Sequence, residues 1–127
     1  MVSNAADSIR EAAEEPDGRA LYWAIYADET PVGFVMISDD VAPGSTGYFP
    51  HYLWKLFIDA RYQGRGFGTA ALDLVVEYFR GRPGVEVLRT SAGQGKGSPI
   101  GFYERYGFAQ TGEIVFDDEV LLQLTLR

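Results

Sequence analysis

Three glycines and two arginines crowd into one short stretch of this sequence. Residues 63–68 have the sequence QGRGFG, with Arg65 inside this stretch and Arg61 just before it. A strongly apolar segment, 52–59, precedes them, and a run with a helical apolar period follows. The first N–H groups of a helix lack partners within the helix, and glycines let an anion approach the backbone closely. The stretch predicts a binding site for a pyrophosphate or a similar anion.

Other interpretations of this turn remain open at the level of local sequence. Gly66, Gly68 and Ala71 match the loose dinucleotide pattern G-x-G-x-x-G/A, and Glu86 follows about 20 residues later as a ribose acceptor. That fold places its glycine turn after the first strand, whereas two strands are expected before it here. Glycines that serve packing alone are a further possibility.

An aromatic group lies in the later segment PIGFYERYGF, which contains Phe102, Tyr103, Tyr106 and Phe108. Such spacing is typical of an apolar core. A phenol with an unperturbed pKa of about 10 also keeps its proton at neutral pH, so one of these tyrosines could act as a general acid. Both interpretations stay open on the residues alone.

Apolar periodicity and turn residues predict the elements that position these groups. Helices are expected over 3–15, after the glycine turn, and over 99–106, and strands over 20–27, 32–38, 52–59, 85–90, 108–116 and 120–126. A crossover helix joins the third strand to the fourth, which predicts a parallel pair. The chain is predicted to be one α+β domain, residues 1–127, with a mixed, mostly antiparallel sheet flanked by helices.

Composition restricts the chemistry and the partners. The chain has 127 residues, 46% of them hydrophobic, which suits a single globular domain and no membrane partner. It has no cysteine and one histidine, His51, so disulfides, thiol nucleophiles and metal sites of the thiolate or His-rich kind are excluded, and no metal is expected. The first residues resemble no export signal, which predicts a cytoplasmic location.

The net charge of −7 is distributed unevenly. Residues 1–50 carry nine acidic and two basic side chains, residues 51–110 five acidic and eight basic, and residues 111–127 four acidic and one basic. The total argues against a nucleic-acid partner. The basic middle coincides with the glycine turn, and the acidic start would either attract a cationic ligand or form a solvated helix face.

Two motifs resemble the GNAT (Gcn5-related) N-acetyltransferase family. LFIDARYQGRGFGTAAL resembles motif A of that family, in which Gln63, Gly66 and Gly68 meet the pattern Q/R-x-x-G-x-G/A. PIGFYERYGF resembles a later motif with an aromatic–Tyr pair on a short helix. The segments VSNAADSIREA, YADETPVGFVM and TGEIVFDDEVLLQLTL are similar to bacterial diamine (spermine and spermidine) acetyltransferases of the family. The resemblance therefore covers nearly the whole chain.

This resemblance implies an acyl-CoA N-acyltransferase fold with acetyl-CoA as co-substrate. The cofactor would lie where strands 52–59 and 85–91 splay apart, with its pyrophosphate on the N–H groups of the turn and its pantetheine arm along the third strand. The cofactor-binding residues it implies are Leu56, Phe57, Ile58, Gln63, Gly64, Arg65, Gly66, Phe67, Gly68, Thr69 and Tyr103.

The resemblance also assigns Tyr103 as the general acid that protonates the leaving CoA thiolate. The attacking amine must lose a proton first, and histone-type relatives keep a glutamate for this step where Tyr52 stands here. The adjacent His51 is the expected substitute, with Glu29 as a further candidate.

Two more departures from the family pattern affect the acceptor site. Lys96 stands where relatives often carry an asparagine that touches the CoA arm. The segment before the first strand, residues 1–19, is short for the family by one strand and one helix. Because that part usually builds one wall of the site and one edge of the sheet, a homodimer that completes the site is expected.

The sequence thus predicts direct transfer of acetyl from acetyl-CoA to a primary amine of a small molecule, with a polyamine as one candidate acceptor. An aminoglycoside or a protein N-terminus would need the same chemistry. The alternative, from a different functional class, is a CoA-binding module of the same fold with little or no catalysis.

Overall fold

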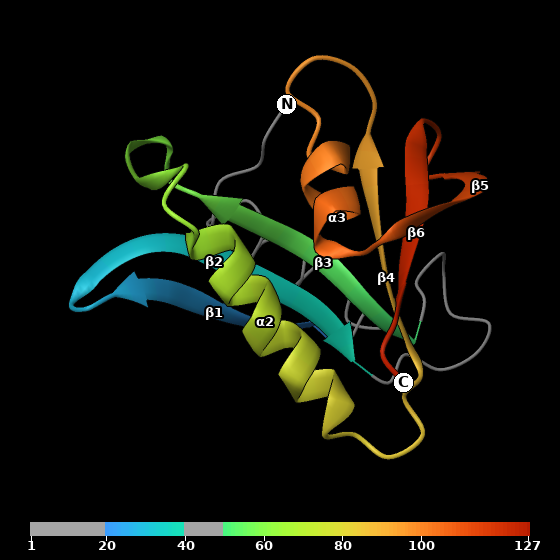
Figure 1. Ribbon diagram of the computed structural model, residues 1–127, viewed down its shortest axis with the longest axis horizontal. Helices are drawn as coiled ribbons and strands as arrows, with labels where there is room; N and C mark the ends of the chain where they lie inside the picture. Colours follow the sequence, from blue (N-terminus) through green and yellow to red (C-terminus); the bar gives the residue numbers. More distant parts are fainter. Residues whose placement is uncertain (1–19, 40–49) are drawn as a thin grey trace.

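One six-stranded mixed sheet forms the centre of the computed structural model, which describes residues 20–39 and 50–127 (Figure 1). The strand order is β1-β2-β3-β4-β6-β5. In chain order the elements are β1 (Ala20–Ala27), β2 (Thr30–Asp39), β3 (His51–Ile58), the 3-10 turn η2 (Ala60–Tyr62), α2 (Phe67–Arg80), β4 (Val87–Gly93), α3 (Ile100–Tyr106), β5 (Ala109–Val115) and β6 (Glu119–Thr125). This architecture confirms the predicted α+β fold. The helix predicted over 3–15 lies outside the described residues.

The parallel pair of strands separates soon after it forms. β3 and β4 are aligned at Tyr52 opposite Arg89 and at Leu53 opposite Thr90. From residue 54 to its end, β3 is paired with β2 alone among the described strands, while β4 continues against β6. The predicted splay is therefore present, and its branch point is the Leu53–Thr90 pair.

β3 is also irregular just after this branch point. Met36 of β2 lies opposite Lys55, but the next residue, Ile37, lies opposite Leu53, so Trp54 is one residue in excess. A bulge of this kind bends a strand and re-aims the residues that follow it. The bulge therefore lies at the start of the splayed segment, residues 54–58, and beyond it residues 55–58 pair regularly with residues 33–36 of β2.

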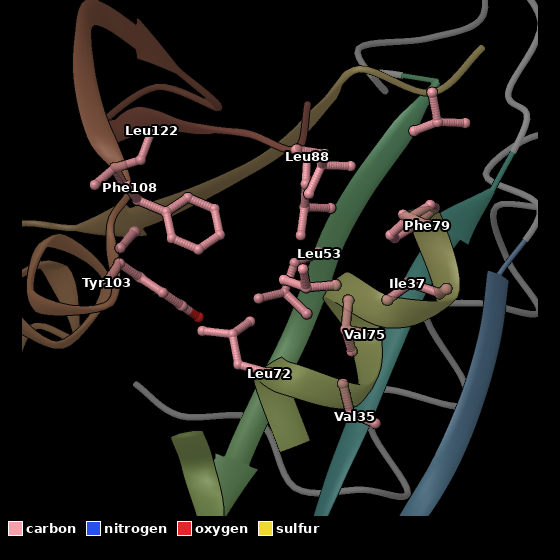
Figure 2. Close-up of a cluster of buried hydrophobic side chains, with 14 of the residues drawn as sticks. Val35, Ile37, Leu53, Leu72, Val75, Phe79, Leu88, Tyr103, Phe108 and Leu122 are labelled. Carbon is pink, nitrogen blue, oxygen red and sulfur yellow. The ribbon is translucent and has the colours of Figure 1, made fainter. Parts of the chain in front are cut away.

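Helices α2 and α3 lie on one side of the sheet (Figure 1), which we call the first face. Helix α2 packs on the first face through side chains at helical spacing. The buried ones are Ala71, Leu72, Val75, Val76 and Phe79. Figure 2 shows several of them in one cluster with Leu53 of β3 and Leu88 of β4. Complete burial of such side chains contributes about 1.5–3 kcal/mol each. This packing fixes the start of α2, and with it the glycine turn, at the end of β3.

The start of the fourth strand and the buried side of α2 differ from the prediction for physical reasons. The fourth strand, predicted over 85–90, begins at Val87, because Val85 closes the turn after α2 by donating its N–H to the Arg82 carbonyl (3.3 Å). Tyr78 follows the apolar period of α2 but is only half-buried. Its hydroxyl donates to the Asp39 carboxylate (2.7 Å), and Val76 takes the buried position instead.

Candidate active site

The glycine turn leaves backbone donors free of helix partners. The first hydrogen bond of α2 runs from the Ala70 N–H to the Gly66 carbonyl oxygen (3.0 Å). The N–H groups of Phe67, Gly68 and Thr69 precede it and so have no acceptor within the helix. No side chain caps this helix start, and its first turn contains no acidic residue. The donors and the positive end of the helix dipole suit an anion.

The glycines themselves have structural causes. Gly64 and Gly66 have φ angles of 78° and 85°, in the left-handed region, where a side chain costs about 1–2 kcal/mol. Gly68 has a different cause, because a Cβ there would lie 3.3 Å from the ring of Phe102 on α3. These glycines shape the turn with or without a ligand, so the anion site depends on the free N–H groups and the nearby charge.

The two arginines of the turn are not equivalent. Arg61 donates to the carboxylate of Asp59 from Nε and from its terminal nitrogen, each at 3.1 Å. This hydrogen bonding lowers the pKa of Asp59 and raises that of Arg61. Arg65 has no carboxylate partner in the part of the chain that the structure describes, and its guanidinium carbon lies 5.7 Å from the centre of the Tyr62 ring. Arg65 is therefore the cation available to an anion at this turn.

The residues predicted to contact the pantetheine arm lie between the turn and the branch point. Leu56, Phe57 and Ile58 are half-buried and form the splayed end of β3, with β2 on one edge. Gln63, the first residue of the Q/R-x-x-G-x-G/A pattern, donates its side-chain amide to the Ile58 carbonyl oxygen (3.0 Å). This bond anchors the turn to the strand, so Gln63 positions the site.

Tyr103 lies at the branch point, on the first face. It is buried against Phe102 and Phe108, and Figure 2 shows its hydroxyl directed from α3 into the cluster near Leu72. The hydroxyl is hydrogen-bonded to Thr90, which itself donates to the Leu53 carbonyl oxygen (3.0 Å). Burial raises the pKa of Tyr103 to about 12, although the Thr90 bond opposes the shift. The phenol therefore keeps its proton across the physiological range.

His51 lies at the other end of β3, before the paired residues. Its Nδ1 is 3.4 Å from a carboxylate oxygen of Asp39, and its ring packs edge-on against Phe79 at 5.6 Å. Asp39 also forms an ion pair with Arg82. The structure does not bring His51 together with the splayed segment, which begins beyond Leu53, so its role as the base stays a prediction.

Two further positions that the sequence singled out lie on loops. Glu29 is exposed between β1 and β2, and Lys96 is exposed in the loop between β4 and α3. Neither lies on the splayed segment of β3. Their proposed contacts with the acceptor and with CoA remain predictions.

The opposite side of the sheet, which we call the second face, carries a hydrogen-bonded group that was not predicted. The hydroxyl of Tyr52 is hydrogen-bonded to the Ser91 hydroxyl. Ser91 in turn donates to a carboxylate oxygen of Glu119 (2.7 Å). Because neighbouring strand residues point to opposite faces, Ser91 points away from the side where Thr90 meets Tyr103. We call Tyr52, Ser91 and Glu119 the second-face chain.

Neither a metal site nor a membrane-spanning helix is found among the described residues. Across 20–39 and 50–127, no three histidine, aspartate or glutamate side chains are placed to hold a metal ion. In those same ranges no helix has the length and apolar character needed to cross a membrane.

Comparison with known proteins gives consistent results. A model described as the acetyltransferase (GNAT) family matches residues 3–108. The spermine/spermidine N(1)-acetyltransferase of Bacillus subtilis is 29% identical, over 72% of this chain and 67% of that protein.

Solved structures share the fold. An acetyltransferase from Thermus thermophilus superposes with a TM-score of 0.71 at 21% identity, covering 98% of this chain and 77% of the other. A Bacillus subtilis acetyltransferase in complex with CoA has a TM-score of 0.71 at 17% identity, covering 97% and 85%.

Proposed function

This chain belongs to the acetyltransferase (GNAT) family, and we propose that it transfers acetyl from acetyl-CoA directly to a primary amine of a small molecule, with a polyamine as the first candidate. One observation carries the proposal. The splayed end of β3 has the free N–H groups of the glycine turn beyond its far end and the Tyr103 hydroxyl at its branch point. In this proposal a phosphate-bearing thioester lies between them.

The backbone does most of the binding in this proposal. The N–H groups of Phe67, Gly68 and Thr69, together with the Arg65 guanidinium, bind the pyrophosphate. The splayed edge of residues 56–58 bonds the pantetheine arm as an added strand would, and one N–H there polarises the thioester carbonyl. Acetyl-CoA supplies the activated acetyl group.

Tyr103 acts on the leaving group. Its hydroxyl donates a hydrogen bond to the sulfur as negative charge develops there. Complete transfer from a phenol with a pKa of about 12 to a thiolate whose thiol has a pKa of about 8.5 is uphill in water. Burial raises the pKa of a thiol in the same way, which reduces the difference at this site. In the proposed step Tyr103 gives its proton to the sulfur as the C–S bond breaks.

The proposal also names a polyamine as the acceptor. The spermine/spermidine N(1)-acetyltransferase of Bacillus subtilis is similar over most of this chain. The net charge of −7, concentrated in residues 1–50, favours a cationic acceptor over a neutral one. Both observations support a polyamine.

Thiol release from acetyl-CoA tests the function. We expect release with spermidine, and less with kanamycin or with a peptide N-terminus. CoA alone should stabilise the chain by about 2.7 kcal/mol at a concentration of 100 Kd. Stabilisation by CoA without thiol release for any amine would support the non-catalytic CoA-binding module. A melting temperature that CoA leaves unchanged would contradict both functions.

The expected homodimer belongs to the proposal as well. β1 is an outer strand of the described sheet, and it exposes Tyr22, Trp23 and Tyr26. An outer strand with exposed aromatic side chains favours pairing with a second copy. Sedimentation velocity at micromolar concentration should show a dimer, and a single monomeric species would contradict it.

A further inference from the structure

The second-face chain is a polar group at the branch point that the proposed function leaves without a role. Its three members come from three different strands, β3, β4 and β6, and they meet one residue from the Leu53–Thr90 pair. Tyr103 occupies the same level of the sheet on the first face. A thioester at the branch point would therefore have a proton donor on one face and this group on the other.

Glu119 is the member suited to accept a proton. Ser91 donates to its Oε1, and no arginine or lysine of the described residues forms an ion pair with this carboxylate. The side chain is half-buried, in register opposite Gly93 and therefore on the same face as Ser91. A partly desolvated carboxylate without a counter-ion attracts a cation, and the protonated acceptor amine is one.

The other two members orient this carboxylate. Since the Ser91 hydrogen goes to Glu119, the Tyr52 hydroxyl is the donor in its bond with Ser91. Tyr52 is itself buried and packs edge-on against Phe116 at 6.2 Å. The bonds therefore run in one direction, from Tyr52 to Ser91 to Glu119, and hold Oε1 of this carboxylate.

We propose that Glu119 is the general base for the acceptor amine and that Ser91 and Tyr52 position it on the second face of the sheet. This inference rests on the proposed acetyl transfer. It gives the chain a carboxylate base that comes from β6, although the family's usual position on the third strand holds a tyrosine.

Protons and electron pairs balance over the step. Oε2 of Glu119 takes one proton from the ammonium, which becomes a neutral amine. Its lone pair forms the C–N bond to the acetyl carbon, the C–S bond breaks, and that electron pair goes to sulfur. Tyr103 gives its proton to the sulfur and recovers the second proton that the nitrogen loses. Glu119 returns its proton to solvent, so one ammonium yields one amide, one thiol and one proton.

The test compares two amines whose need for a base differs. Spermidine is protonated at pH 7, since an alkylamine has a pKa of about 10.4, whereas 2,2,2-trifluoroethylamine is neutral at that pH. We expect Glu119→Gln to lower kcat with spermidine by about 100-fold and to change the rate with trifluoroethylamine by less than about 5-fold. Ser91→Ala should lower kcat with spermidine by about 10-fold, and Glu119→Asp should restore part of the loss.

Glu113→Gln is the matched control, because Glu113 is exposed on the neighbouring strand β5, and it should leave both rates unchanged. Equal loss with both amines in Glu119→Gln, or a raised KM with an unchanged kcat, would overturn the inference. A wild-type chain that binds CoA but releases no thiol with either amine would instead overturn the proposed function on which the inference rests.

Discussion

The two faces of the sheet differ at the point where β3 leaves β4. On the first face, a phenol hydroxyl lies among apolar side chains and its hydrogen-bond partner, Thr90, leads to the Leu53 carbonyl oxygen. On the second face, hydroxyls lead to the Glu119 carboxylate, which is half-buried. Both are short hydroxyl chains, but one ends on a neutral acceptor and the other on an anion.

One branch point whose two faces differ in this way can serve two proton transfers. Burial in an apolar cluster disfavours the phenolate, so Tyr103 keeps its proton until negative charge develops on the leaving sulfur. In the proposed transfer, the Glu119 carboxylate on the second face receives a proton. The sheet itself keeps the two apart.

The largest effect should come from the first face. Tyr103→Phe removes the proton donor but leaves the ring, so kcat should fall by about 100-fold or more while CoA still raises the melting temperature. Tyr106→Phe is the matched control on the same helix, because its hydroxyl donates to Asp73 (2.7 Å) at the helix surface. An unchanged kcat in Tyr103→Phe would show that Tyr103 is not the proton donor.

Alkaline pH tests the environment of the same phenol. The folded-state pKa of about 12 exceeds the unfolded value of about 10, so its stabilising effect is complete below pH 10 and is lost as pH rises toward 12. The expected loss is about 2–3 kcal/mol. Urea unfolding between pH 8 and 12 should show a smaller loss in Tyr103→Phe. Equal losses would mean that the buried phenol titrates normally.

Thr90→Val should have an intermediate effect. It removes the hydroxyl shared by Tyr103 and the Leu53 carbonyl, which should cost about 1–2 kcal/mol of unfolding free energy and lower kcat by about 10-fold. The exposed Thr125 on β6 provides the control Thr125→Val. If Thr90→Val retained full kcat, the hydrogen bond would not be orienting the phenol.

The smallest expected effect concerns CoA binding at the glycine turn. The turn would hold the one thioester on which both faces act. Arg65→Ala should weaken CoA binding by about 5-fold, an amount typical of an exposed charge pair, and the effect should shrink at high salt. Arg61→Ala should change the Kd by less than about 2-fold, because Asp59 already holds that guanidinium. Calorimetric titration at two salt concentrations measures both. A larger increase in Kd for Arg61→Ala than for Arg65→Ala would show that Arg61, and not Arg65, binds the anion.

Much of this arrangement follows from sequence. Alternation and apolar runs predicted the strands, a crossover helix predicted the parallel pair, and the QGRGFG segment predicted a turn with free N–H groups. The burial of Tyr103 also followed from the spacing of its aromatic neighbours. Apart from the parallel pair, whose residues Leu53 and Thr90 are linked through the crossover helix, each of these features depends on residues close together in the chain.

The rest depends on register between distant strands. Tyr52 and Ser91 are 39 residues apart, and Ser91 and Glu119 are 28 apart, so no local pattern links them. The bulge at Trp54 has no signal either, because tryptophan suits a regular strand. By contrast, the Asp59–Arg61 pair is local, and the acidic side chain two residues before the arginine was a signal that could have been used.

Amide chemical shifts give the most direct test that CoA occupies the splay. In a titration of nitrogen-15-labelled protein with acetyl-CoA, the N–H signals of Phe67, Gly68 and Thr69 should move most, together with those of residues 54–58. Signals of β1 and of β5 should move little. Saturable binding that leaves the turn and the splayed segment unperturbed would contradict the account.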